Sequence, residues 1–356
     1  MKILRRGLVF FASLAVIVAI GACERQITRV EQVVTAQNCF DCHSDNNTFL
    51  VSAEQQWLNS VHASGNNIDH NDNGCQVCHT SEGFVASVTG GTVPPIVDNP
   101  TPIHCFTCHA PHTSGDFGLR VTTDAVLQNG VSFDLGAGNL CVSCHHSRQN
   151  VDTFVKTAND TVIFTSPYWG PHHSVQGDML IGSNGYEYAS FNYTDTGHKL
   201  FTTDGCIDCH KDVTQNLVLG GHSFNMTFVE AADTVMNTEA CKSCHGTLPD
   251  FDRFGVQTSV EALLATLKAQ LLAANLIDAQ GHTVGSSTNP RVVASSDSAG
   301  AVWNFLLVEE DRSRGVHNRE YIEGLLNSSI LFMQGVLPAP PADVAAKRHG
   351  SQSGQR

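Results

Sequence analysis

Apolar side chains follow helical spacing in the last third of the chain. Val260 is followed, at intervals of three and four residues, by aliphatic residues that would share one face of a helix, namely Leu263, Leu264, Leu267 and Leu271. Thr258 and Glu261 stand at the start of this run with the spacing of a capping box. The same pattern predicts a second helix over about 299–310 and a third over about 318–334. We therefore expect a helical region over 251–336, followed over 337–356 by a disordered tail rich in Pro, Ala, Gly and Ser.

The sequence between residues 23 and 250 shows little hydrophobic periodicity. It is rich in Gly, Asn, Asp and Thr, and each segment has too few apolar residues for a conventional core. Segment 168–186 contains Tyr168-Trp169-Gly170-Pro171 and Asn184-Gly185-Tyr186, a composition typical of a loop or short hairpin. The pattern as a whole predicts a mostly α protein with extensive irregular structure.

Residues 1–22 have the features of an export signal. Lys2, Arg5 and Arg6 precede an apolar run, residues 8–20, which is too short for a confident membrane span. The run ends in Gly21-Ala22-Cys23, which resembles the lipobox of bacterial lipoproteins. That resemblance implies cleavage before Cys23, a diacylglycerol on its sulfur, and an outer-membrane lipoprotein on the periplasmic or cell-surface face. A plain signal peptide with an incidental cysteine is the alternative.

Composition and charge exclude two classes of protein. The 356 residues include 20 basic and 34 acidic residues, a formal net charge of −14, whereas a nucleic-acid-binding protein would carry a basic stripe. No apolar run beyond the first segment is long enough to span a bilayer, which argues against a multi-span membrane protein.

Cysteine spacing gives the chain its candidate chemistry. Twelve of the 13 cysteines fall into six Cys-x-x-Cys-His units, and Cys23 is the thirteenth. The cysteines of the six units are Cys39 and Cys42, Cys75 and Cys78, Cys105 and Cys108, Cys141 and Cys144, Cys206 and Cys209, and Cys241 and Cys244. The histidines that follow them are His43, His79, His109, His145, His210 and His245.

This unit is the attachment signature of c-type haem. Two thiols about one helical turn apart can reach the two vinyl groups on one porphyrin edge, and the adjacent imidazole binds the iron. Zinc sites and redox dithiols also use Cys-x-x-Cys, but neither requires a histidine after all six units. Between residues 39 and 334 the chain resembles the multihaem c-type cytochromes. The resemblance implies six covalently bound haem c groups within 23–250, with the haems supplying much of the core.

Twelve further histidines could supply a second axial ligand to each iron. We expect six of them to do so and the haems to have low potentials: His62, His112, His172, His198, His222 and His317. His146 and His173 are the rivals, while His70 and His104 are expected to lie near haems without binding iron. His62 follows Trp57-x-x-Ser60-x, a segment similar to one that supplies a distal ligand in multihaem cytochromes. The helices around His317 resemble the C-terminal helices of the cytochrome c nitrite reductase superfamily.

These features favour an electron carrier over an enzyme. We expect it to pass respiratory electrons to other cytochromes or to extracellular acceptors such as ferric oxides. One alternative is a multihaem reductase of nitrite or hydroxylamine, which would need an open iron site; His146 with Arg148 is its nearest candidate. Another is a homo-oligomer, a polymeric cytochrome wire in which a neighbouring protomer supplies one distal histidine. A structural lipoprotein with incidental haems is a third.

Overall fold

The computed structural model describes residues 46–336, except 66, 158, 196, 213–215 and 231–232. The export signal, Cys23, the first Cys-x-x-Cys-His unit with Cys39, Cys42 and His43, and the tail lie outside the described residues. Among the described helices, none combines the length and the apolar character needed to cross a bilayer.

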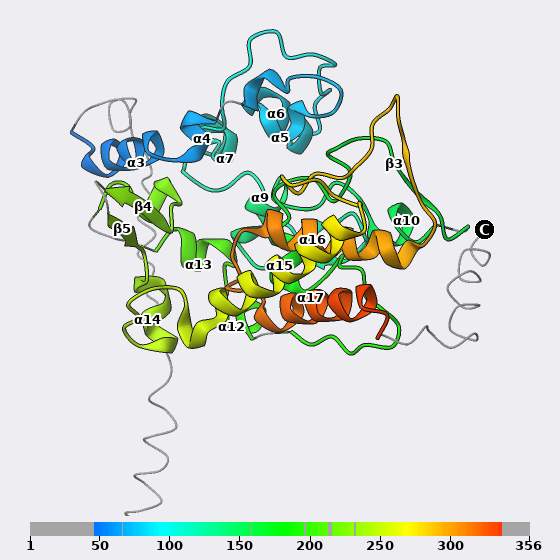
Figure 1. Ribbon diagram of the computed structural model, residues 1–356. Helices are drawn as coiled ribbons and strands as arrows, with labels where there is room; N and C mark the ends of the chain where they lie inside the picture. Colours follow the sequence, from blue (N-terminus) through cyan, green and yellow to red (C-terminus); the bar gives the residue numbers. More distant parts are fainter. Residues whose placement is uncertain are drawn as a thin grey trace, which may run out of the picture. The chain divides into compact units, whose positions relative to one another are not determined.

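Three helices near the C-terminal end pack against one another (Figure 1). They are α15 (Val256–Ala273), α16 (Ser296–Asp311) and α17 (Arg319–Met333), close to the three ranges that the sequence predicts. Helix α15 buries Val260, Leu264, Leu267 and Leu271 on one face, as the apolar spacing requires. The side chains of Ser295 and Asn318 cap α16 and α17 by accepting hydrogen bonds from backbone N–H groups of the first turn.

The predicted capping box at the start of α15 is wrong. The helix begins at Val256, after Gly255 in the left-handed conformation, so Thr258 already lies inside the first turn. The Asp252 carboxylate accepts hydrogen bonds from the backbone N–H and the hydroxyl of Thr258, at 3.1 and 2.6 Å. Glu261 instead lies 4.0 Å from the Arg314 guanidinium. The carboxylate of Asp252, in the turn before the helix, therefore caps α15 in place of the predicted pair of Thr258 and Glu261.

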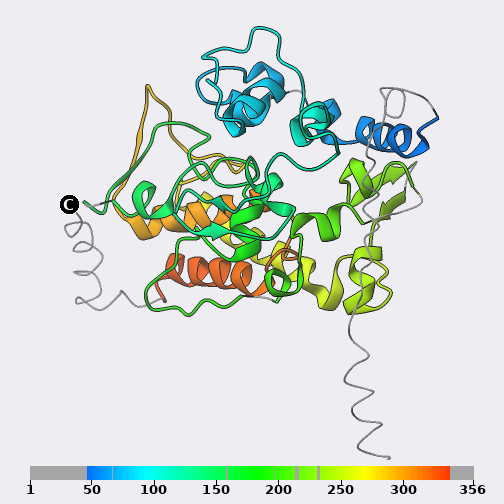
Figure 2. The same ribbon diagram turned by 180° about the vertical axis from the view of Figure 1, so that it is seen from behind.

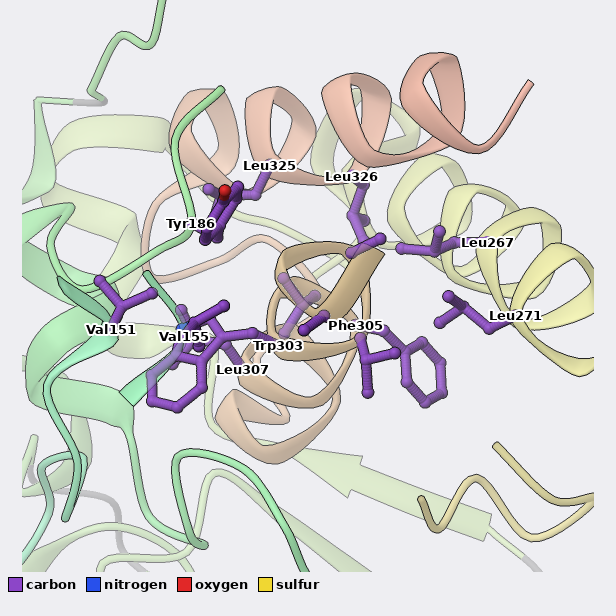
Figure 3. Packing of buried hydrophobic residues seen from close by; sticks show 14 of the residues in the cluster. Val151, Val155, Tyr186, Leu267, Leu271, Trp303, Phe305, Leu307, Leu325 and Leu326 are labelled. Atoms are coloured by element: carbon purple, nitrogen blue, oxygen red, sulfur yellow. The ribbon is translucent and has the colours of Figure 1, made fainter. Parts of the chain in front are cut away.

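Helix α16 forms the centre of a conventional hydrophobic core. Trp303, Phe305 and Leu307 are at most 2% exposed; Trp303 and Leu307 project from one side of the helix and Phe305 from another (Figure 3). Leu325 and Leu326 of α17, and Leu267 and Leu271 of α15, lie around them. A helix that is apolar on nearly all sides is buried in the interior, which is the position of α16.

The middle of the chain contributes to the same core, contrary to the expectation that residues 23–250 lack one. Val151 and Val155 pack with Trp169, Tyr186 and other residues of the α16 cluster. Segment 168–186 contains a helix, α11 (Gln176–Ile181), and no strand. Its aromatic side chains are irregularly spaced along the sequence. Hydrophobic periodicity therefore could not predict that they are buried.

Hydrogen bonds fix this middle segment to α16. The Asn304 side chain accepts from the backbone N–H of Tyr186 at 2.7 Å and donates to its carbonyl at 2.9 Å. The Trp303 indole N–H donates to the carbonyl of Asn184 at 2.7 Å. Figure 2 shows the green loops of this segment lying over the orange helix α16. Buried backbone groups of an irregular segment thus find partners on a regular helix.

Short helices and two-stranded sheets make up the rest of the described chain. The helices are α3 (Thr48–Leu58), α4 (Val61–Ser64), α5 (Gln76–His79), α6 (Ser81–Val88), α7 (Cys105–Cys108), α8 (Pro111–Ser114), α9 (Gly138–Val142), α10 (Val151–Phe154), α12 (His198–Phe201), α13 (Cys206–His210) and α14 (Glu239–His245), with 3-10 turns η2 (Asn67–Asp69), η3 (Gly221–Ser223) and η4 (Arg253–Gly255). The antiparallel pairs are β1 (Ala125–Val126) with β2 (Ser132–Phe133), β3 (Val162–Phe164) with β6 (Arg291–Val293), and β4 (Thr227–Glu230) with β5 (Asp233–Met236). The register of β3 and β6 pairs Val162 with Val293, which ties the middle of the chain to the segment before α16.

Candidate functional site

A short helix is present at each Cys-x-x-Cys-His unit of the described chain. These helices are α5, α7, α9, α13 and α14, counted from the second unit to the sixth. In the second, third and fourth units the backbone N–H of the histidine donates to the backbone carbonyl of the first cysteine at 2.9–3.1 Å. One turn of backbone therefore presents two thiols and one imidazole together, as the spacing predicts.

The histidine of each of these five units faces a second histidine from a distant segment. The distances between ring centres are 6.4 Å for His79 and His172, 6.4 Å for His109 and His222, 6.1 Å for His145 and His62, 6.4 Å for His210 and His317, and 6.1 Å for His245 and His198. The partners come from elements as different as α4, η3, α12 and the loop before α17. Residues that the sequence separates are thus brought together in five similar pairs.

These separations fit a metal ion held between two imidazoles. An imidazole nitrogen binds a metal at about 2 Å and lies about 1.1 Å from its ring centre, so two imidazoles on opposite sides of one ion have centres about 6.3 Å apart. All five pairs lie within a few tenths of an ångström of that value. The residues present therefore fit a six-coordinate haem iron at each pair.

Hydrogen bonds at Nδ1 orient many of these imidazoles. The Nδ1 atoms lie 2.6–3.3 Å from their acceptors: His109 from the Phe117 carbonyl, His145 from Gln176 Oε1, His172 from the His173 carbonyl, His198 from the Val316 carbonyl, His210 from the Phe224 carbonyl, and His317 from Asp311 Oδ1. An Nδ1–H that donates to an oxygen leaves the lone pair on Nε2, the nitrogen that is then free to bind a metal. Sequence reasoning missed all of these acceptors, because most are backbone carbonyls and carry no residue signature.

Burial keeps most of these imidazoles neutral, which is the form that binds metal. It lowers the pKa of His62 to about 4, with a further contribution from nearby His145, and that of His222 to about 3. Burial also lowers the pKa of His145 and His210. At His317 burial acts downward too, but the charge and hydrogen bond of Asp311 outweigh it and the pKa is raised.

The other candidate histidines have different surroundings. The His70 ring centre lies 5.1 Å from that of His79, too close for an iron atom between them by the distances above. His173 forms an ion pair with Glu310 at 2.8 Å, and the hydrogen bond to this carboxylate raises its pKa. His104 caps α7, where its Nδ1 accepts from the Phe106 N–H at 3.2 Å.

Two further histidines complete this comparison. The Nδ1 of His146 lies 2.7 Å from the Ser147 carbonyl, and within the described chain its ring contacts no other histidine ring. His112 lies on α8 with its ring centre 5.5 Å from that of Phe106. The first unit, with which it would have to pair, lies outside the described residues.

Comparison with known proteins points to one class. No family model matches the chain. It is 24% identical over 290 residues to the C-type polyheme cytochrome OmcB of Geobacter sulfurreducens, covering 66% of this chain and 38% of that protein. It is 26% identical over 290 residues to OmcC of the same organism, covering 66% of this chain and 37% of that protein. The chain is related to the multihaem c-type cytochromes.

A solved structure confirms the fold prediction. The chain resembles the Outer Cell Wall Cytochrome OcwA with a TM-score of 0.50 and 21% identity, covering 78% of this chain and 50% of that one. The mostly helical fold with small sheets is thus that of a known multihaem cytochrome. The chain spans half the length of OcwA and less than two fifths of the lengths of OmcB and OmcC.

The fourth unit lies close to two other units. The thiol of its Cys144 lies beside that of Cys78 in the second unit, and this neighbour lowers the pKa of Cys78 to about 7. The thiol of its Cys141 lies beside that of Cys206 in the fifth unit, and this neighbour lowers the pKa of Cys141. In c-type cytochromes these sulfurs carry the porphyrin edges, so the corresponding haem edges in this chain would approach one another closely.

Backbone packing supports the second of these contacts independently of the thiols. The Ala137 N–H, just before α9, donates to the Asp204 carboxylate at 2.9 Å. A Cβ atom on Gly138 would lie 3.2 Å from the backbone nitrogen of Cys206. Glycine at this position therefore allows the fourth and fifth units to pack backbone against backbone.

Proposed function

We propose that this chain is an exported multihaem c-type cytochrome that carries electrons along closely spaced, bis-histidine haems. The observation that carries the proposal is the set of five histidine pairs with ring centres 6.1–6.4 Å apart. Each pair joins the histidine of a haem-attachment unit to a histidine that has no cysteine motif of its own. The relationship to proteins named as polyheme cytochromes supports the same conclusion.

The proposed haem ligands follow from these pairs. His172 would serve the haem of the second unit, His222 the third, His62 the fourth, His317 the fifth and His198 the sixth. The first haem, held by Cys39, Cys42 and His43, would take His112, the last of the six distal ligands that we expect from the sequence. The chain would then hold six haem c groups.

The chain's own residues would set position and ligation, while the haem supplies the redox chemistry. When bound, each haem c accepts and releases one electron at its iron. The cysteines would hold each porphyrin by two thioethers. The two histidines would fill both axial positions and lower the potential relative to a Met/His cytochrome.

Bis-histidine ligation favours a carrier over a reductase. A reductase of nitrite or hydroxylamine needs an iron with a free coordination position. Within the described chain, the histidine of each attachment unit is faced by another imidazole at a distance that one iron can bridge. His146 is the best candidate for a catalytic residue in such a reductase. It directly follows the fourth haem-attachment unit, whose His145 is already faced by His62.

The proximity of the units suggests a route for electrons. The fourth unit would lie between the second and the fifth, because Cys144 is a neighbour of Cys78 and Cys141 a neighbour of Cys206. Helices α13 and α14, which carry the fifth and sixth units, also pack together. Electrons could then pass through the second, fourth, fifth and sixth haems in order.

The proposed location and partners depend on the export signal and on the relatives. A lipid on Cys23 would anchor the protein to the outer membrane, and the electrons would pass to partner cytochromes or to extracellular acceptors such as ferric oxides. OcwA is by name an outer cell wall cytochrome, which is consistent with such a role. The covalent link to haem would prevent its loss outside the inner membrane.

Electron paramagnetic resonance of the oxidised protein tests this proposal. We expect covalently bound haem, only low-spin ferric signals, and no change on adding nitrite or cyanide. The variant His62→Ala should convert one haem to high-spin ferric, whereas the matched variant His146→Ala should leave every signal low-spin. A protein without covalent haem would overturn the assignment as a cytochrome, and a native high-spin haem that binds nitrite would favour the reductase.

A further inference from the structure

The carboxylate of Asp311 is the hydrogen-bond acceptor for the Nδ1 of His317, one of the candidate haem ligands. Asp311 is the last residue of α16, and its side chain is fully buried. Its Oδ1 lies 2.6 Å from the Nδ1 of His317. Where the described structure gives an acceptor for the Nδ1 of the other paired histidines, it is a neutral oxygen: the carbonyls of Phe117, His173, Val316 and Phe224, and the side-chain amide of Gln176.

The carboxylate is held in place by Ser313. The backbone N–H of Ser313 donates to Asp311 Oδ2 at 3.3 Å, and its hydroxyl donates to the same oxygen. The Ser313 Oγ in turn accepts from the backbone N–H of His317 at 3.2 Å. Carboxylate, hydroxyl and imidazole therefore form a closed local network that fixes the direction of the Nδ1–H bond.

The two arginines nearest to Asp311 in sequence pair with other carboxylates. Arg312 pairs with Glu310 at 3.8 Å and its side chain is 77% exposed. Arg314 donates to Glu309 at 3.3 Å and lies 4.0 Å from Glu261. The negative charge of Asp311 is therefore directed at the imidazole of His317, in surroundings that screen it less than water would.

A charged acceptor at Nδ1 makes the other ring nitrogen a stronger donor. An imidazole whose Nδ1–H is drawn toward a carboxylate gains histidinate character and donates more charge to the metal through Nε2. Greater donation stabilises ferric over ferrous iron, and a nearby buried negative charge acts in the same direction. Both effects lower the reduction potential.

We propose that Asp311 makes the haem between His210 and His317 the most reducing of the five haems whose ligands the structure describes. The inference rests on the proposed function, since it presumes a haem iron between these two histidines. Asp311 touches neither the haem iron nor a substrate, and it acts through His317 as a positioning and tuning residue.

The test is a redox titration resolved by haem, using optical and electron paramagnetic resonance spectra of the whole holoprotein. Asp311→Asn keeps the size of the side chain and removes its charge. We expect one low midpoint potential to rise, the other potentials to stay nearly constant, and the low-spin g-values of one haem to shift. Asp297→Asn is the matched control: it removes a charge from the opposite end of α16, where Asp297 accepts from the Tyr186 hydroxyl at 2.7 Å.

A second variant predicts a change of opposite sign. Ser313→Ala removes the hydroxyl that donates to Asp311 Oδ2, so more of the negative charge would remain for His317, and the same midpoint potential should fall. This variant also decides the matter if Asp311→Asn does not fold.

The outcomes separate this inference from the proposed function. If Asp311→Asn moves every potential by no more than Asp297→Asn does, or if Ser313→Ala leaves unchanged the potential that Asp311→Asn raises, the tuning role is refuted while all-low-spin spectra still support the carrier. If the native protein shows no low-spin haem, the proposed function itself fails.

Discussion

The ring of Phe224 lies edge-on to the imidazole of His62, with their centres 5.5 Å apart. The same ring lies 6.2 Å from His222, and the Phe224 carbonyl is the acceptor for the Nδ1 of His210. One residue therefore contacts a candidate ligand of the third, fourth and fifth haems. Its backbone has a φ of 57°, a left-handed conformation that is uncommon outside glycine and that directs ring and carbonyl to different neighbours.

Replacing this ring should disturb two haems and leave a third unchanged. In Phe224→Leu the carbonyl for His210 remains, but the edge contacts with His62 and His222 are lost. We expect shifted g-values for the two haems that these histidines would bind, and a loss of about 1 kcal/mol in the free energy of unfolding because the side chain is only partly buried. Phe201→Leu, at a side chain that is 81% exposed, should change neither quantity. A shift at the haem of His210 and His317 as well would show that the backbone had moved.

The stability of the core should depend on the buried side-chain amide of Asn304. In Asn304→Ala the backbone N–H and carbonyl of Tyr186 lose their partners, and Ser329 loses the N–H that donates to its hydroxyl. Because these groups are buried, we expect the free energy of unfolding to fall by about 2–4 kcal/mol, measured by urea denaturation with far-ultraviolet circular dichroism. The haem content of the folded protein should be unchanged, and Ser298→Ala, at a partly buried side chain in the first turn of the same helix, should cost far less. A loss below about 0.5 kcal/mol would contradict this role of Asn304.

Asp178 should make stability depend on pH. Burial raises the pKa of this carboxyl to about 6, although the hydrogen bond from the Ser147 backbone N–H acts in the other direction. In the unfolded chain the pKa is about 3.9, so between pH 4 and 6 the folded state keeps a proton that the unfolded state has released. The contribution of Asp178 therefore becomes less favourable as pH rises through this window, by about 3 kcal/mol in total, and is constant above it.

A comparison with Asp178→Asn isolates this effect from those of other acids. The variant cannot ionise at this position, so its stability relative to the native protein should rise between pH 4 and 6 and then level off. The measurement is urea denaturation of both proteins at matched pH values. A difference that does not vary with pH would show that Asp178 is already ionised in the folded protein at pH 4.

Membrane attachment should depend on Cys23. The variant Cys23→Ser leaves the export signal intact but offers no thiol for a diacylglycerol. We expect it to appear in the soluble extracellular or periplasmic fraction, while the native protein stays with the outer membrane. Labelling with radioactive palmitate should mark only the native protein. Equal distribution of the two proteins between fractions would favour the plain signal peptide.

The sequence predicts the periodic parts of this molecule well and the irregular parts poorly. Helix α15 follows from Val260, Leu264 and Leu267, because a fixed interval of apolar residues has one structural solution. Its start does not follow, because Asp252 reaches the first turn from outside the helix. Tyr186 and Trp169 also escape prediction, since their burial depends on α16, which lies far along the chain.

The candidate site likewise has some features that the sequence predicts and others that it does not. Cysteine spacing predicts the five described attachment helices, because the unit is contiguous in sequence. The sequence does not show which of two adjacent histidines faces the second unit: the ring centre of His172 lies 6.4 Å from that of His79, whereas His173 pairs with Glu310. The acceptors at Nδ1 are mostly backbone carbonyls, which only the folded chain can bring into position.

The side chain of Gln176 lies between the C-terminal end of α16 and the fourth attachment unit. Its Nε2 donates to the carbonyl of Glu310 at 3.1 Å, while its Oε1 is 3.1 Å from the Nδ1 of His145. The orientation of His145 therefore depends on where the end of α16 lies. A chain shortened before α16 would lose both the contact that aligns His145 and the segment that carries His317.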